Sequence, residues 1–269
     1  MNTLAQNLEN VKEAFSRQSI NYDLYEEENI ILAEMRKRVR DHLLRYLNKD
    51  DRILELNAGT GLDATFFAGK GFQVHATDFS PGMILQIKNK IKKNNLFEKI
   101  SVQQCSFTNL DEIKTGPFDY IFSNFGGLNC IPNLREVTKI FPKLLKPGGK
   151  ITLVLMPKIS PWELALMFKG NFKTAFRRFS SKQPNAKIEG IKFISYYHSP
   201  HKVIKSLDKR FKILKIVGLS SLAPPPFVKN LPFQHPDFYR FLQKLDYQFS
   251  HLPLLNRWAD HYIITLQYL

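Results

Sequence analysis

The sequence predicts an α/β protein in which helices cover both faces of a doubly wound parallel sheet. Two observations lead to this class. Short apolar strands alternate with helical segments between residues 52 and 156, and a glycine-rich loop directly follows the first of these strands. The content of 43% hydrophobic and 23% charged residues is that of an ordinary globular protein and excludes extended disorder.

The length of 269 residues suits one large domain with insertions. Apolar residues recur at helical spacing between residues 30 and 47, so we expect a helical cover over residues 1–50. The main domain is expected at 51–269, with insertions at about 158–190 and 220–258.

The first half of this domain follows a regular strand and helix order. Arg52–Leu56 is an apolar strand, Asn57–Gly61 a loop, and residues 62–70 a helix. A second strand over 73–77 ends at Asp78, and Ser80 caps the helix that follows. Further strands are predicted over 100–105, 118–123 and 150–156, with a helix over 133–145.

The rhythm changes after Met156. A basic amphipathic helix is predicted over 160–179, then a strand over 192–197 and a helix to about Arg210. The remaining elements are a strand over 211–217, a helix over 238–249 and a last strand over 261–266.

The formal net charge of +15 is unevenly distributed. Residues 158–215 contain 14 basic and 3 acidic residues, whereas residues 1–57 contain 9 basic and 11 acidic residues. The basic segment is compatible with nucleic acid, anionic lipid, an acidic substrate or simple solubility.

The sequence predicts a cytoplasmic protein. It contains no apolar run of the roughly 18 to 20 residues that a bilayer span requires, and its first residues lack the apolar centre of a signal peptide. Two cysteines, Cys105 and Cys130, are too few for a disulfide framework and fit a reducing compartment.

The glycine loop predicts a nucleotide site. Gly59 and Gly61 allow the backbone to approach a ligand, and the following helix directs its N-terminus at it. Asp78 at the end of the second strand can accept hydrogen bonds from two ribose hydroxyls. A dinucleotide fingerprint would have a third glycine where Ala64 stands, and Glu55 beside the loop suits a cationic amine better than a pyrophosphate.

Four segments resemble the successive motifs of class I S-adenosylmethionine-dependent methyltransferases. They are residues 53–61 (ILELNAGTG), 76–83 (ATDFSPGM), 118–124 (FDYIFSN) and 144–149 (LLKPGG). Residues 15–23 also resemble the N-terminal segment of the ubiquinone and menaquinone C-methyltransferase-like branch, where this segment covers the cofactor. The resemblance extends over about residues 15–157 and implies a Rossmann-like, mostly parallel, seven-stranded sheet.

The resemblance implies S-adenosyl-L-methionine as cofactor. Its methionine end would lie at Glu55 and the backbone of 57–61, and its ribose at Asp78. Asn57 stands where the family usually has glycine, and Ser106 where it usually has the acid that holds the adenine amine. The full set of predicted cofactor-binding residues is Tyr22, Glu55, Asn57, Ala58, Gly59, Gly61, Asp78, Phe79, Met83, Ser106, Phe107, Asn124 and Phe125.

Methyl transfer from a sulfonium needs alignment, and a base only where the acceptor must lose a proton. The candidates for such a base are His198 and His201, which follow the predicted strand over 192–197. A surface or capping role for both histidines is the alternative. We predict no metal site, because no Cys or acidic cluster completes a ligand set around them.

The predicted acceptor is a small apolar or acidic molecule, such as a lipid, a quinone-like compound or an acyl compound. Contact with an anionic membrane surface is a further expectation, because apolar and basic residues share the segment 160–179. Two alternatives remain open: an RNA or DNA methyltransferase, and a non-catalytic protein that binds S-adenosylmethionine. Against nucleic acid, the loop after the fourth strand lacks the paired prolines that grip a flipped base.

Overall fold

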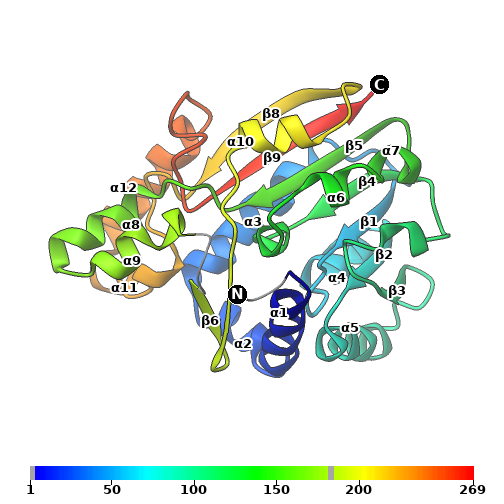
Figure 1. The fold of residues 1–269 in the computed structure, drawn as a ribbon, viewed down its shortest axis with the longest axis horizontal. Helices are drawn as coiled ribbons and strands as arrows, with labels where there is room; N and C mark the ends of the chain where they lie inside the picture. The colour runs from blue at the N-terminus through cyan, green and yellow to red at the C-terminus, as the bar shows by residue number, and fades with distance from the viewer. Residues whose placement is uncertain (1–3, 181–184) are drawn as a thin grey trace.

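The computed structural model describes residues 4–180 and 185–269 and is built around a seven-stranded sheet (Figure 1). The strand order is β3-β2-β1-β4-β5-β9-β8; the first five strands are parallel, and β9 runs antiparallel to both β5 and β8. This confirms the predicted α/β class. The strands are β1 (Arg52–Leu56), β2 (Gln73–Asp78), β3 (Ile100–Gln104), β4 (Phe118–Ser123), β5 (Leu145–Leu155), β8 (Phe211–Leu219) and β9 (His261–Tyr268).

Helices cover both faces of the sheet, as predicted. Successive strand side chains point to opposite faces, so β1, β4, β5 and β9 each contribute to two separate hydrophobic clusters. One cluster packs against α3 (Ile30–Leu44), α4 (Leu62–Gly69) and α5 (Pro81–Asn94). The other packs against α6 (Arg135–Thr138), α7 (Phe141–Leu144) and α10 (Pro200–Ser206).

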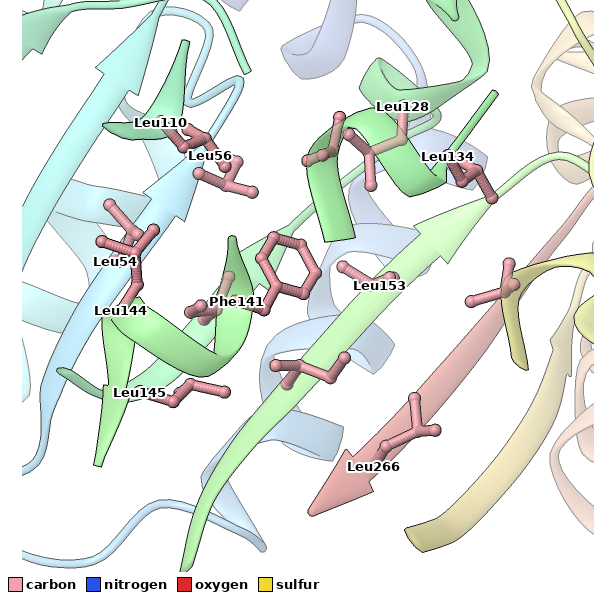
Figure 2. Close-up of a cluster of buried hydrophobic side chains, with 14 of the residues drawn as sticks. Leu54, Leu56, Leu110, Leu128, Leu134, Phe141, Leu144, Leu145, Leu153 and Leu266 are labelled. Carbon is pink, nitrogen blue, oxygen red and sulfur yellow. The ribbon is translucent and has the colours of Figure 1, made fainter. Parts of the chain in front are cut away.

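The second cluster is drawn in Figure 2, where Phe141 lies over the sheet beside Leu153. Both side chains are fully buried. Truncating a buried phenylalanine to alanine costs about 3 to 5 kcal/mol, because the transfer free energy is lost and a cavity remains. The sheet is therefore a stable base for the residues that follow its strands.

Two N-terminal helices, α1 (Leu4–Gln18) and α2 (Tyr22–Glu27), precede α3. Helix α1 lies against the start of α5 at Gly82, whose N–H donates to Ser16 Oγ at 3.0 Å. A Cβ at Gly82 would come within 2.5 Å of the Ser16 carbonyl oxygen, so this close approach requires glycine. The division into a cover at 1–50 and a domain at 51–269 stays a prediction.

The segment after β5 differs from the predicted single helix over 160–179. It consists of α8 (Pro161–Ala165), η3 (Leu166–Lys169), α9 (Phe172–Phe176) and η4 (Arg177–Phe179). The reason is local: Gly170 adopts a left-handed φ of +75°, and the Asn171 side chain caps the next helix. Residues 181–184 of the predicted insertion lie outside the described residues.

Two other predicted elements also differ. Of the predicted strand over 192–197, only residues 192 and 193 belong to a strand. That strand is β7 (Ile191–Phe193), which pairs with β6 (Ala186–Ile188) in a separate hairpin. The predicted helix over 133–145 is divided into α6 and α7, because Pro142 in the first turn of α7 cannot donate to a preceding helical turn.

The remaining elements are η1 (Leu110–Glu112), η2 (Gly127–Cys130), η5 (Pro226–Val228), α11 (Leu231–Gln234) and α12 (Pro236–Phe249). Helices α8, α9, α11 and α12 gather at one end of the molecule, at the left in Figure 1. Within residues 4–180 and 185–269, no helix has both the length and the hydropathy to cross a membrane.

Candidate functional site

A cavity lies where the parallel strands β1 to β4 end. It measures about 690 Å³ when the space open to solvent is included. Residues that follow these strands form one side of the cavity, and residues of α1 form another. Its lining consists of Leu8, Val11, Lys12, Phe15, Tyr22, Asn57, Gly59, Asp78, Phe79, Ser80, Met83, Cys105, Phe107, Asn124, Phe125, Gly127 and Cys130.

The loop after β1 has an unusual backbone that its sequence explains. Asn57, Gly59 and Gly61 have φ values of +47°, +59° and +81°. Asparagine tolerates this left-handed region better than other side chains. The Asn57 amide also fixes the neighbouring strand end, because its Nδ2 donates to the Asn124 carbonyl at 2.9 Å and its Oδ1 accepts from Ser123 Oγ at 2.6 Å.

Asp78 is the last residue of β2 and lies on the cavity wall. Its Oδ2 accepts from the Gly59 N–H at 2.9 Å, and its Oδ1 accepts from the Ser80 N–H at 2.8 Å. Burial raises the pKa of Asp78 to about 6, although these backbone donors oppose the rise. Each oxygen keeps a lone pair, so a ligand with two adjacent hydroxyls can bind both.

Glu55 lies in β1 and lines a smaller cavity that shares Asn57, Gly59 and Phe125 with the first. Only 2% of the Glu55 surface is exposed, and its Oε2 has no hydrogen-bond partner among the described residues. Burial, reinforced by the charge of Asp63, raises the pKa of Glu55. An unpartnered buried carboxylate oxygen is costly, and a cationic ligand group would satisfy it.

A buried ion-pair network closes the deep end of the smaller cavity. Arg36 on α3 pairs with Glu26 and with Asp63, the second residue of α4. Asp63 also accepts from Arg40 Nε at 2.7 Å and from Asn124 Nδ2 at 2.7 Å. The Arg36 guanidinium lies 4.7 Å from the centre of the Phe125 ring. The network therefore orients the two residues that follow β4.

The start of α2 is fixed over the glycine loop. Asp23 accepts from Thr60 Oγ1 and pairs with Lys90 Nζ, each at 2.5 Å. The preceding residue, Tyr22, lines both cavities, and burial raises the pKa of its hydroxyl. On the opposite wall, Lys12 Nζ of α1 lies 5.0 Å from the centre of the Phe79 ring.

The structure brings most of the predicted cofactor-binding residues together. Those that line one of the two cavities are Tyr22, Glu55, Asn57, Ala58, Gly59, Asp78, Phe79, Met83, Phe107, Asn124 and Phe125. Gly61 and Ser106 line neither cavity. The Ser106 hydroxyl is engaged locally, 2.8 Å from Thr108 Oγ1. The binding role of each residue stays a prediction.

The two histidines predicted as bases lie away from this cavity lining. His198 is buried, and its Nε2 hydrogen-bonds to the Ile131 carbonyl at 2.9 Å. Burial lowers the pKa of His198 to about 4, which favours the neutral ring. His201 is exposed on the first turn of α10. In the described part of the chain, no group of three His, Cys, Asp or Glu residues could hold a metal ion.

Arg36 and Asp63 are site residues that were not predicted from the sequence. Arg36 belongs to the run Arg36-Lys37-Arg38-Val39-Arg40, which is typical of a solvated helix face. Its burial depends on α4 bringing Asp63 against it. The one available signal was an acid in the first turn after the glycine loop, where the helix dipole favours a negative charge.

Comparison with known proteins agrees with this geometry. A family model described as "Methyltransferase domain" matches residues 53–149. A demethylmenaquinone methyltransferase from Leptospira interrogans is 26% identical over 159 residues, which cover 56% of this chain and 63% of the relative. The chain thus spans less than two thirds of the length of that relative.

Solved structures show the same fold. A geranyl diphosphate C-methyltransferase from Streptomyces coelicolor, in complex with S-adenosyl-L-homocysteine, matches with a TM-score of 0.57 and 13% identity, over 88% of this chain and 81% of that chain. A SAM-dependent methyltransferase from Methanosarcina mazei matches with a TM-score of 0.57 and 18% identity, over 84% and 96%.

The residues present fit S-adenosylmethionine. The unpartnered Glu55 oxygen suits its ammonium group, and the two acceptor oxygens of Asp78 suit its ribose hydroxyls. The matched methyltransferase domain contains both residues. Residues 53–149 of this chain therefore match a methyltransferase domain, and the chain is similar in sequence to demethylmenaquinone methyltransferases and in fold to S-adenosylmethionine-dependent methyltransferases.

Proposed function

We propose that this protein transfers a methyl group from S-adenosylmethionine to a small apolar acceptor, with a quinone-like ring on an apolar chain as the preferred class. The observation that carries the proposal is the joint presence of Glu55, Asp78 and an apolar wall in adjoining cavities. The names of the relatives support the acceptor class, because they are demethylmenaquinone methyltransferases.

In this proposal the chain holds the cofactor at three places. Glu55 binds the ammonium group, Asp78 binds the ribose, and Phe79 and Met83 pack against the adenine. Arg36 also lines the smaller cavity, where Glu26 and Asp63 already pair with its guanidinium. When bound, the cofactor supplies a methyl group on a sulfonium for in-line displacement.

The contribution of the protein is alignment and exclusion of water. Helix α1 covers the cavity with Leu8, Val11 and Phe15, so a bound ligand is shielded from solvent. Phe125 lies between the two cavities and is held in a left-handed conformation with φ +42°. Its backbone N–H donates to the Asn124 side chain at 2.8 Å, which fixes the position of the ring.

The proposed acceptor reaches the protein from an anionic membrane surface. On the segment 161–179, Phe168 is 84% exposed and Phe172 61% exposed, and Lys169 and Lys173 lie beside them. The acid of this segment, Glu163, is neutralised by two arginines. The second insertion adds further exposed aromatic residues at the same end of the molecule, namely Phe227, Phe233, Phe238 and Phe241 (Figure 1).

Vesicle binding tests the membrane contact. Each lysine near an anionic surface contributes about 1 kcal/mol, so replacing Lys169 and Lys173 by serine should lower partitioning onto phosphatidylserine vesicles roughly 30-fold. A matched control replaces Lys92 and Lys93, two exposed lysines at the end of α5. Equal partitioning of the variant and the wild type would contradict the membrane contact and leave the methyl transfer untouched.

Label transfer tests the activity. The protein is incubated with methyl-labelled S-adenosylmethionine and a short-chain prenylated naphthoquinol, with a prenyl alcohol and a tRNA mixture as competing acceptors. The proposal expects label in the quinol. Label in the tRNA would favour the nucleic-acid alternative. Calorimetric binding of the cofactor without label in any acceptor would favour a non-catalytic binding protein.

A further inference from the structure

His261 lies beside the two cavities without lining either, and its neighbour Phe125 lines both. His261 is the first residue of β9, and the next residue, Tyr262, pairs with Leu155 at the end of β5. The imidazole packs edge-on against Phe125, with 5.6 Å between the ring centres. Phe125 lines both cavities, so its side chain lies between His261 and the space where the ligands would bind.

The hydrogen bonding of His261 leaves one ring nitrogen available. Nδ1 lies 2.8 Å from Asp260 Oδ2. A carboxylate only accepts, so Nδ1 carries the hydrogen, and Nε2 of the neutral ring has a free lone pair. Among residues 4–180 and 185–269, nothing hydrogen-bonds to that Nε2. His198 differs, because its Nε2 already contacts a carbonyl oxygen.

Asp260 is itself fixed by a buried network that begins in the first insertion. Arg178 Nη2 donates to Asp260 Oδ1 at 2.8 Å, and Arg178 Nη1 donates to the Asp260 carbonyl at 2.9 Å. Glu163 on α8 completes the network, 2.6 Å from Arg178. Burial opposes ionisation of Asp260, but the hydrogen bond from His261 and the charge of Arg178 hold its pKa well below the usual range.

We infer that His261 is the general base that removes a proton from the acceptor, with Asp260 and Arg178 as positioning residues. This inference rests on the proposed methyl transfer and names the proton acceptor for it. A carboxylate paired to Nδ1 fixes the tautomer and ring orientation and stabilises the imidazolium that forms. The insertion over 161–179 therefore has a second role, because it supplies the arginine that holds the carboxylate.

The Nε2 lone pair of His261 takes the proton of an acceptor hydroxyl, and the electron pair of that O–H bond moves onto the acceptor ring. The ring carbon forms a bond to the methyl group while the bond between methyl and sulfur breaks with its pair on sulfur. Loss of the ring C–H proton to water restores the aromatic system, and the imidazolium returns its proton to the acceptor oxygen.

The decisive variant is His261→Asn, because the asparagine amide can still donate to Asp260 but cannot accept the proton. Loss of a positioned general base lowers kcat by about 10² to 10⁴. We expect this loss with an unchanged cofactor Kd by calorimetry. The control is His251→Asn, which replaces an exposed histidine just after α12 and should leave kcat unchanged.

The pH profile separates a chemical role from a structural one. The charged groups around His261 are Asp260 directly before β9, Arg178 on η4, Glu163 on α8, and Arg36 of α3 across the Phe125 ring. Wild-type kcat should fall on the acid side as the imidazole is protonated. His261→Asn should lose this limb, whereas Asp260→Asn should retain it at lower kcat.

A second readout does not depend on turnover. Imidazole NMR signals of the free protein, assigned to His261 by their loss in His261→Asn, should shift when the naphthoquinol is added in the presence of S-adenosylhomocysteine. If the wild type transfers label and His261→Asn retains full kcat with an unchanged pH profile, the inference is wrong while the proposed function stands. If the wild type transfers no label, both are wrong.

Discussion

The region of residues 52–156 and the region of residues 157–260 achieve order by different means. In the first, parallel strand ladders place Asn57, Asp78 and Asn124 at one edge of the sheet. In the second, short helical segments project from the sheet, and buried ion pairs centred on Arg178 tie them to β9. Backbone geometry thus builds the first region, and side-chain pairing builds the second.

Breaking the central ion pair of the second region should have the largest effect. Arg178 is 3% exposed and contacts both Glu163 and Asp260. Removing one partner of a buried network leaves uncompensated charge, which costs about 3 to 5 kcal/mol. Arg178→Met should lower the free energy of unfolding by that amount in a denaturant titration.

The same variant tests whether the two regions are independent. Below its unfolding transition, Arg178→Met should bind S-adenosylmethionine with a Kd within about twofold of wild type, because none of the lining residues of either cavity contacts Arg178 in an ion pair. Arg178→Lys, which keeps the charge but loses the bidentate geometry, should be intermediate in stability. A loss below 1 kcal/mol for Arg178→Met would show that the network does not hold the insertion.

The difference between the regions also explains what the sequence could predict. The strand, loop, helix and Asp78 of the first region follow from local patterns, because apolar periodicity and glycine positions act over a few residues. In the second region, the helix over 160–179 is interrupted at Gly170, and the segment 191–193 pairs with a neighbouring hairpin strand. Such outcomes depend on partners that periodicity does not specify.

Charged side chains were the hardest part of the candidate site to predict. Arg36 and Arg178 stand in basic runs that are typical of solvated surfaces, yet both are buried against carboxylates from distant segments. Both His198 and His261 are buried, but His198 hydrogen-bonds to the distant Ile131 carbonyl, whereas His261 pairs with the carboxylate of its sequence neighbour Asp260.

The second-largest effect should come from Asp78 in the first region. A hydrogen bond to a charged group contributes about 1.5 to 3 kcal/mol, so Asp78→Ala should weaken S-adenosylmethionine binding by roughly 10-fold to 150-fold in calorimetry. Asp111→Ala, a change at an exposed acid in η1, is the control. Unchanged affinity in Asp78→Ala would mean that another group holds the ribose.

The pH dependence of cofactor binding sharpens the same assignment. The pKa of Asp78 is raised from its ordinary 3.8 to about 6 in the free protein, so the folded state binds this proton more tightly than the unfolded state. Its contribution to the free energy of unfolding therefore falls as pH rises from about 4 to about 6. Ribose hydroxyls donate to the ionised carboxyl, so cofactor affinity should rise over this range.

The expected rise is about fivefold between pH 5 and pH 6, because the ionised fraction of a carboxyl with a pKa of about 6 grows from roughly a tenth to a half. Glu55, whose pKa burial also raises, acts in the same direction. Asp78→Asn should therefore show a shallower rise, not a flat profile. Calorimetry at pH 5, 6 and 7 measures both slopes, and a flat wild-type profile would contradict the role of Asp78.

The smallest effects compare one helix cap in each region. Ser80 Oγ accepts from the Met83 N–H at 3.3 Å in the buried start of α5, and Asn171 Oδ1 accepts from the Thr174 N–H at 3.1 Å at the exposed start of α9. Loss of a cap costs about 1 kcal/mol where the helix is part of the cooperative core. Ser80→Ala should therefore lower global stability by about that amount.

Asn171→Ala should lower global stability by only a few tenths of a kcal/mol, because a five-residue helix at the surface can fray without unfolding the sheet. Hydrogen exchange in residues 172–176 should nevertheless accelerate in Asn171→Ala. If the two variants lose the same global free energy of unfolding, then α9 is as cooperative with the sheet as α5 is.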